Sequence, residues 1–141
     1  MAVFVLNTNV LLSAALTPPS PPGRIVLQLT AVDSPHQLAF SEQTWDELVN
    51  VLQRRKFDVY ISTDERLVYL RQLESVALWC APQIGVTDCR DHDDNRILEV
   101  ALAASAQAVV SGDKDLLVLH PWRGIPILRA APFLALHSAA H

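Results

Sequence analysis

Short apolar runs alternate with longer helical patterns along almost the whole chain, and this alternation most constrains the fold. The runs are rich in Val, Ile, Phe and Leu and fall at residues 2–6, 37–40, 82–86, 108–111 and 125–128. Strands that alternate with helices form a parallel sheet with helices packed on its faces. The sequence therefore predicts an α/β fold with a central, mostly parallel five-stranded sheet flanked by helices.

Capping residues and prolines indicate where the helices begin and end. Ser41 is placed to cap one helix, and residues 62–65 (STDE) fit a capping box at the start of another. Residues 17–23 (TPPSPPG) cannot continue a helix, so we expect a rigid surface connection there. The expected helices lie at about 9–16, 24–31, 41–55, 62–79, 112–119 and 130–136, with a further one that begins after a cap among residues 91–93.

Length and composition indicate one soluble domain over residues 1–141. A chain of 141 residues, half of them hydrophobic, can bury a core without disulfides or zinc, and two cysteines are too few for either framework. No apolar run is long enough to span a membrane, and the start lacks the pattern of an export signal. We therefore expect a cytoplasmic protein with no membrane partner. The net charge of −4 argues against wholesale coating of nucleic acid but allows a local basic patch.

Three polar clusters stand where apolar segments stop. They are Asn7 with Asn9, residues 91–94 (DHDD), and Asp113 with Asp115. Ligands of open α/β sheets bind beyond the carboxyl ends of the strands, so these clusters are expected to share one pocket. Crowded carboxylates repel one another unless a cation lies between them, and oxygen ligands suit a hard divalent metal ion. The sequence therefore predicts an anionic metal site.

Each acid also has a plain structural explanation. Asp94 precedes Ile97 and Leu98 by three and four residues, so its carboxylate should face the sheet, but it could simply cap a helix. Asp113 and Asp115 could favour a helix start through the helix dipole, and Glu47 could be a solvated helix residue. Only the combination of these acids favours a functional site.

Taken in order, four segments resemble the motifs of PIN domain ribonucleases, and more narrowly the PIN-type toxins of bacterial toxin–antitoxin systems. The segments are residues 5–14 (VLNTNVLLSA), 41–48 (SEQTWDEL) followed by 52–57 (LQRRKF), 89–95 (CRDHDDN) with 97–99 (ILE), and 110–117 (VSGDKDLL). The resemblance implies a PIN-like fold and an endoribonuclease that hydrolyses phosphodiesters with a metal-activated water and Mg²⁺ or Mn²⁺. It also implies an RNA substrate, a cognate antitoxin, and a homodimer whose surface includes the apolar helix over residues 62–79.

The resemblance also assigns roles to single residues. The catalytic and metal-binding positions fall on Asn7, Glu47, Asp94 and Asp113, with Asp115 as a further metal ligand. Thr8, Asn9 and Ser111 would orient ligands or waters, and Arg54, Arg55, Lys56 and Lys114 would contact RNA. The family pattern has Asp where this chain has Asn7. An amide carries no charge, so this chain is expected to bind metal weakly and to be impaired as an enzyme.

Two other functions are compatible with these motifs. A PIN-like scaffold could bind RNA or protein without cleaving. A phosphatase resembling the haloacid dehalogenase superfamily ranks lower, because it needs a carboxylate nucleophile at the first motif and a phosphate-binding lysine between the halves. Residue 7 is Asn, and no lysine lies between Lys56 and Lys114.

Overall fold

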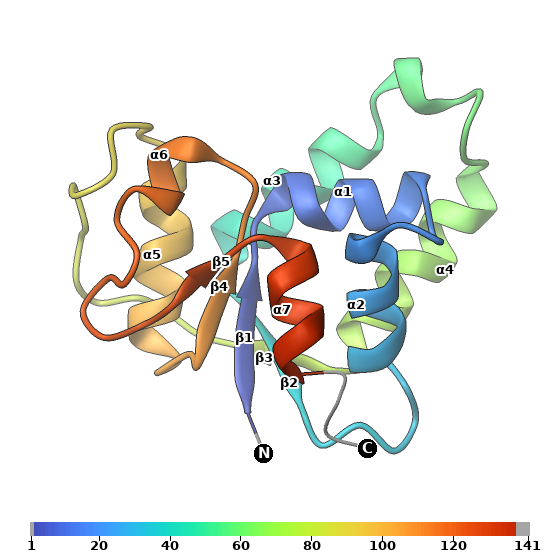
Figure 1. Ribbon diagram of the computed structural model, residues 1–141. Helices are drawn as coiled ribbons and strands as arrows, with labels where there is room; N and C mark the ends of the chain where they lie inside the picture. Colours follow the sequence, from blue (N-terminus) through green and yellow to red (C-terminus); the bar gives the residue numbers. More distant parts are fainter. Residues whose placement is uncertain (1, 138–141) are drawn as a thin grey trace.

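The computed structural model describes residues 2–137, in which a five-stranded sheet lies between two layers of helices (Figure 1). Met1 and residues 138–141 of the predicted domain lie outside this range. The strands are β1 (Val3–Leu6), β2 (Gln37–Phe40), β3 (Ala77–Trp79), β4 (Ala108–Val110) and β5 (Ile127–Leu128). Their spatial order is β3-β2-β1-β4-β5, and each adjacent pair is parallel. The predicted α/β fold class is confirmed.

The described residues also contain seven α-helices and one 3₁₀ helix, all of which lie between strands except the last, which follows β5. They are α1 (Thr8–Leu16), α2 (Pro21–Leu29), α3 (Glu42–Leu52), the 3₁₀ helix η1 (Arg55–Phe57), α4 (Thr63–Glu74), α5 (Asp94–Ala103), α6 (Lys114–Leu117) and α7 (Ala130–His137). In Figure 1, α5 and α6 lie on one side of the sheet, and α1, α2, α4 and α7 lie on the other. None of the helices in the described part of the chain is long and apolar enough to cross a membrane.

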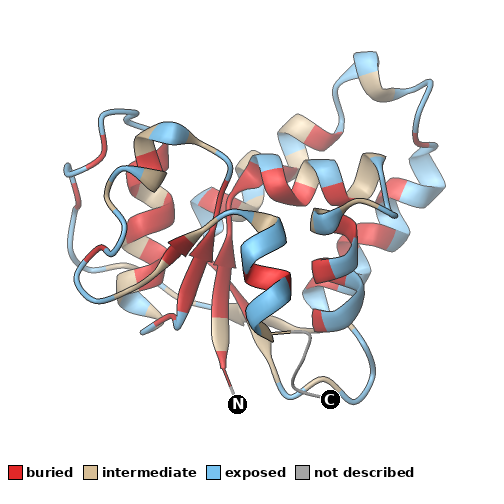
Figure 2. Ribbon diagram, in the orientation of Figure 1, coloured by how far each residue is buried: buried red, intermediate tan, exposed pale blue. Residues whose placement is uncertain are grey.

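Strand residues bury their side chains on alternate faces of the sheet. Phe4 and Leu6 of β1 belong to the apolar cluster formed with α1, α2, α3, α4 and α7, while Val5 belongs to the cluster formed with α5. In β4, Val110 belongs to the first of these clusters and Val109 belongs to the second. Figure 2 shows the central strands buried along most of their length. A sheet covered on both faces explains why these strands are continuous apolar runs.

The prediction of the third strand was wrong. Residues 82–86 form no strand, and β3 is Ala77–Trp79, inside the stretch predicted as the end of a helix. The helix ends at Glu74, so the apolar residues that follow it pair with β2 instead. Pro82 lacks an amide hydrogen and Gly85 weakens extended pairing, which disfavours a strand in that segment.

The prolines also act differently from the prediction. Helix α2 begins at Pro21, three residues earlier than expected, with Ser20 as its N-cap accepting a hydrogen bond from the Gly23 amide. Proline is tolerated in the first turn because the amide hydrogens there have no helical partner. The predicted caps of two other helices are confirmed, since Ser41 and Ser62 each accept from the third helical amide.

The order of the strands creates a switch point beside β1. The chain runs from β1 outward through β2 to β3, and then returns to place β4 on the other flank of β1. Connections leave the carboxyl ends of β1 and β4 in opposite directions, which opens a crevice there. The residues that follow these two strands begin at Asn7 and Ser111.

Candidate metal centre

Three carboxylates meet at this crevice. Asp91 precedes α5, Asp94 is its first residue, and Asp113 is the N-cap of α6 directly after β4. One oxygen from each of the three lies within 4.8 Å of the others. Carboxylate oxygens this close together can hold a hard cation such as Mg²⁺ or Mn²⁺.

Asp94 is the most constrained of the three acids. It is 7% exposed, and its Oδ2 atom has no hydrogen-bond partner in residues 2–137. Burial raises the pKa of its carboxyl well above the ordinary value, and Asp113 raises it further through a hydrogen bond and its charge. A buried carboxylate oxygen without a partner is costly, and a bound cation would satisfy it. The donor set therefore fits a divalent metal ion.

Asp113 is held by the start of the helix that it caps. Its Oδ1 atom accepts a hydrogen bond of 2.9 Å from the Asp115 amide, and its own amide donates 3.0 Å to the Ser111 hydroxyl. This pair of hydrogen bonds fixes Asp113 at the start of α6. Asp115 thus supports Asp113 through its backbone, and its side chain lies outside the hollow described below.

Side chains at the ends of β1 and β4 tie these acids to the sheet. The Asn7 amide donates a hydrogen bond of 3.0 Å to the Ser111 hydroxyl, which is fully buried. The next residue, Thr8, donates through its hydroxyl to Glu47 Oε2 at 3.2 Å. Glu47 comes from α3, so this contact brings a fourth acid to the crevice.

These residues line a polar cavity of about 270 Å³, which we call the acidic hollow. Its lining residues are Asn7, Thr8, Asn9, Leu12, Glu47, Val51, Arg54, Lys56, Phe57, Asp91, Asp93, Asp94 and Asp113. The structure thus brings together most of the site residues predicted from the sequence. Ser111 lies beneath the hollow as a partner of Asn7, while Arg55 and Lys114 are exposed and outside its lining.

Asp91 was not predicted as a ligand, although it belongs to the carboxylate cluster. The sequence placed it in one of the polar clusters expected to share the pocket and made it a candidate cap of the next helix, but the resemblance assigned it no role. Its Oδ1 atom accepts from the Asp93 amide at 3.0 Å, which closes a turn before α5. Its place in the acidic segment 91–94 (DHDD) was the available signal.

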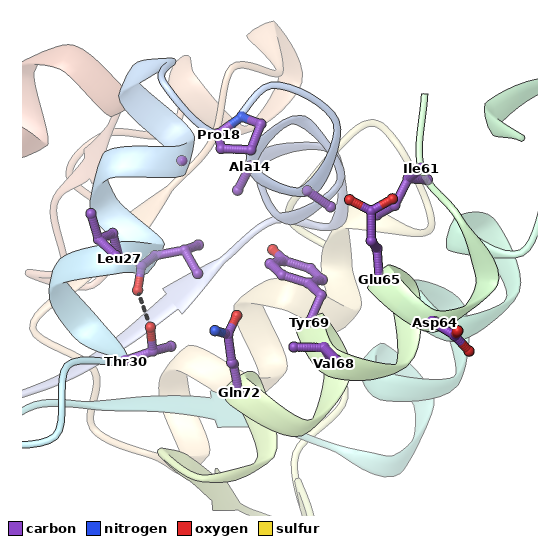
Figure 3. Close-up of a pocket in the computed structure, with 13 residues that line it drawn as sticks. Ala14, Pro18, Leu27, Thr30, Ile61, Asp64, Glu65, Val68, Tyr69 and Gln72 are labelled. Carbon is purple, nitrogen blue, oxygen red and sulfur yellow. Dashed lines mark hydrogen bonds between the residues drawn. The ribbon is translucent and has the colours of Figure 1, made fainter. Parts of the chain in front are cut away.

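A larger hollow of about 440 Å³ lies elsewhere, between α1, α2 and α4 (Figure 3). Figure 3 shows Val68 and Tyr69 of α4 across from Leu27 of α2 and from Thr30, which follows that helix. The wall is mainly apolar, and the acids that line it are Asp64 and Glu65 rather than the three clustered carboxylates. A divalent cation would therefore fit the smaller, polar hollow better than this one.

The fold and the acidic hollow define an α/β protein with an oxygen-lined centre for a divalent cation at the carboxyl edge of its sheet. The family model described as PIN domain matches residues 3–115, so this chain belongs to the PIN domain family. PIN domains are generally nucleases that bind a divalent metal and act on RNA. The chain is also similar to an uncharacterised protein of Methanocaldococcus jannaschii, with 29% identity over 120 residues that cover 82% of this chain and 74% of the relative.

Proposed function

We propose that this protein is a Mg²⁺- or Mn²⁺-dependent endoribonuclease whose reaction takes place in the acidic hollow. One observation carries the proposal. Asp94 holds a buried carboxylate oxygen without a hydrogen-bond partner among the described residues, and one oxygen of its carboxylate lies within 4.8 Å of oxygens from Asp91 and Asp113. This arrangement is unfavourable for the protein alone and becomes favourable when a cation is bound.

Asp94 and Asp113 are the proposed principal ligands, with Asp91, Glu47 and Asn7 around them. A divalent cation bound there would polarise a phosphate oxygen and lower the pKa of an attacking water. Thr8 orients Glu47 through its hydrogen bond of 3.2 Å. Ser111 fixes Asn7 and the Asp113 backbone together. Asp115 is assigned to holding Asp113, since its backbone amide makes that contact.

Arg54 and Lys56 are the proposed RNA contacts at the hollow. Both line it together with the acids, although the chain as a whole carries a net charge of −4. Fixed cations beside the metal ligands would offset the repulsion between the carboxylates and a phosphate backbone. Binding should therefore weaken as the salt concentration rises.

Asn7 is the proposed reason for low activity in this chain. The side chain donates to Ser111 through its amide nitrogen and brings no negative charge to the hollow. A carboxylate at this position would increase the attraction for the cation. We infer that the chain retains its fold and RNA binding while its cleavage rate is reduced.

The four motifs further support a toxin of a toxin–antitoxin pair that acts in the cytoplasm. The antitoxin would mask the acidic hollow. A homodimer is proposed through α4, where Leu67 and Val68 are 50% and 58% exposed. Leu70 and Leu73 of the same helix, also considered for that surface from the sequence, are buried in the core and are excluded from it.

The decisive experiment compares three substrates with the purified chain and with Asn7→Asp. Single-stranded RNA, a structured RNA and a small phosphomonoester are incubated with Mn²⁺, Mg²⁺ or EDTA. The nuclease proposal expects Asn7→Asp to cleave RNA internally in either metal and to leave the phosphomonoester intact. Hydrolysis of the phosphomonoester alone would indicate a phosphatase. Metal-dependent RNA binding without cleavage by Asn7→Asp would indicate the scaffold.

A further inference from the structure

Arg66 of α4 is a buried charge that is not among the residues lining the acidic hollow. Its side chain is 6% exposed, and its Nη2 atom donates to Asp58 Oδ1 at 2.9 Å and to the Arg54 carbonyl at 3.5 Å. These two partners lie at opposite ends of one short turn, residues 54–58. One guanidinium therefore ties both ends of that turn to α4.

The turn holds the cationic residues of the hollow. It contains η1, in which the Phe57 amide donates to the Arg54 carbonyl at 3.1 Å and the Asp58 amide donates to the Arg55 carbonyl at 3.0 Å. Arg54, Lys56 and Phe57 line the acidic hollow from this turn. A 3₁₀ helix of three residues has weak hydrogen-bond geometry, so its position depends on contacts outside it.

Stability alone does not explain a charge at this place. Arg66 Nε has no hydrogen-bond partner within the described part of the chain, and its one carboxylate partner, Asp58, has a side chain that is 59% exposed. Burying a charge with incomplete pairing is unfavourable, and an apolar residue of similar volume often packs as well or better. The burial of this guanidinium is explained if its hydrogen bonds are needed to hold residues 54–58 in place.

We propose that Arg66 is a positioning residue for RNA binding, acting through Arg54 and Lys56. By tying Asp58 and the Arg54 carbonyl, it keeps the two cationic side chains beside a hollow lined by Glu47 and four aspartates. A loose turn would let these cations move away from the phosphates and would leave the acids to repel the RNA. This inference rests on the proposed function, because it takes RNA as the substrate of the hollow.

The first test measures the turn itself. Trypsin cleaves after Arg or Lys, and the turn offers three consecutive sites at Arg54, Arg55 and Lys56. Arg66→Gln should speed cleavage at these sites at least severalfold in the native protein, below its unfolding temperature. Arg71→Gln is the matched control, because it removes the same charge from an exposed position on the same helix. Equal rates of cleavage in the two variants would overturn the proposal.

The second test measures affinity for RNA, using fluorescence anisotropy of a labelled single-stranded oligoribonucleotide in Mg²⁺. Arg66→Gln should weaken binding severalfold relative to Arg71→Gln and should reduce the slope of log affinity against log salt by about 0.7 for each phosphate that the protein no longer neutralises. In a Lys56→Ala, Arg54→Ala background the further effect of Arg66→Gln should vanish, since Arg66 acts through those residues. An undiminished effect in that background would show that Arg66 acts by another route.

The variant Asp58→Ala distinguishes an effect of the Arg66–Asp58 contact on RNA binding from an effect of net charge alone. Removing a negative charge near the hollow should tighten RNA binding if only net charge matters, whereas loss of the tie should weaken it. Thermal unfolding identifies the temperature range in which each variant is folded. If the unaltered chain binds the RNA and Asp58→Ala binds it more tightly, the positioning proposal alone fails. If the unaltered chain does not bind RNA at all, both the positioning proposal and the proposed function fail.

Discussion

The side-chain amide nitrogen of Asn7 lies 3.0 Å from the hydroxyl oxygen of Ser111 and joins the ends of β1 and β4 at the acidic hollow. The same hydroxyl oxygen also accepts from the Asp113 amide. With two donors pointing at it, the Ser111 hydroxyl hydrogen is free to turn elsewhere. An aspartate at position 7 could accept that hydrogen, so the contact can survive with donor and acceptor exchanged.

Asn7→Asp should therefore fold normally and gain metal-dependent RNA cleavage. The added carboxylate strengthens cation binding, and metal stabilisation of the transition state is worth several kcal/mol, with each 1.4 kcal/mol about tenfold in rate. The cleavage rate at fixed salt and Mn²⁺ should rise on the order of a hundredfold or more. EDTA should remove the gain, as should Asp94→Asn in the same background. A folded Asn7→Asp protein that binds Mn²⁺ and leaves RNA intact would contradict this prediction.

Metal ions should stabilise the unaltered chain only modestly and at high concentration. Stabilisation depends on the ratio of the metal concentration to its dissociation constant. Because Asn7 lacks the negative charge of an aspartate, we expect this dissociation constant to be high. Replacing both Asp94 and Asp113 by Asn should abolish the rise in unfolding temperature with Mg²⁺. The control replaces two exposed acids that are outside the cluster and do not line the acidic hollow, Asp33 and Asp64.

The same double variant should be more stable than the unaltered chain when no metal is present, because a buried carboxylate has been removed. Thermal unfolding in EDTA measures this effect, and thermal unfolding in Mg²⁺ measures the loss of metal stabilisation. Metal stabilisation that persists in the double variant would place the ion at another site.

The hydroxyl of Tyr69 should contribute measurably to the packing of α4 on α1. It donates a hydrogen bond of 2.6 Å to the Leu11 carbonyl, and Tyr69 is 8% exposed. Tyr69→Phe keeps the ring and removes the bond, so the free energy of unfolding should fall by about 1 kcal/mol. Tyr60→Phe, at a position that is 69% exposed, should have no measurable effect. Equal urea midpoints for the two variants would show that the hydroxyl contributes nothing.

His137 should make the protein less stable in mild acid. Burial lowers the pKa of His137, whose ring packs on Phe4 and Phe133 beside a hollow that also includes Asp33 and His36. The unfolded chain then binds the proton more readily, so the free energy of unfolding falls as pH drops below about 6.5. The loss levels off below the lowered pKa of the folded state.

His137→Phe tests this dependence by keeping an aromatic ring that cannot be protonated. The variant should lose less stability than the unaltered chain between about pH 7 and about pH 5, measured by urea unfolding. If the two proteins have parallel stability profiles over this range, His137 is not the source of the effect.

Leu67→Glu should weaken the proposed homodimer. Leu67 is 50% exposed on α4, and a charge in an apolar interface carries a desolvation cost. Sedimentation velocity should show a shift from dimer toward monomer, while Val118→Glu, at an exposed position after α6 on the other side of the sheet, leaves the dimer unchanged. An unaltered chain that is monomeric at every tested concentration would rule out the dimer.

The sequence predicted most of the sheet because its central strands are unambiguous. Phe4, Val5, Val109 and Val110 are buried on both faces of the sheet, and such strands read as continuous apolar runs. The edge strand β3 was missed because a short apolar run after a helix fits a further helical turn as well as a strand. This run forms a strand because it pairs with β2, and a contact between distant segments cannot be predicted from the local sequence.

The site was predictable to the extent that its residues follow strands or share a helical face. Asp94 was placed through Ile97 and Leu98, which are buried as expected. Asp91 and the tie from Arg66 depend on how a loop and a distant helix fold back toward the crevice. Such long-range contacts leave no periodic signal in the sequence.

The contact between Asn7 and Ser111 spans 104 positions of the chain. During synthesis from the N-terminus, the first motif leaves the ribosome long before Asp113 does, and β1 lacks its β4 neighbour until then. A partly made chain therefore has no complete acidic hollow. If the protein cleaves RNA, that chain cannot attack its own messenger or the ribosome that translates it until β4 and Asp113 have been made.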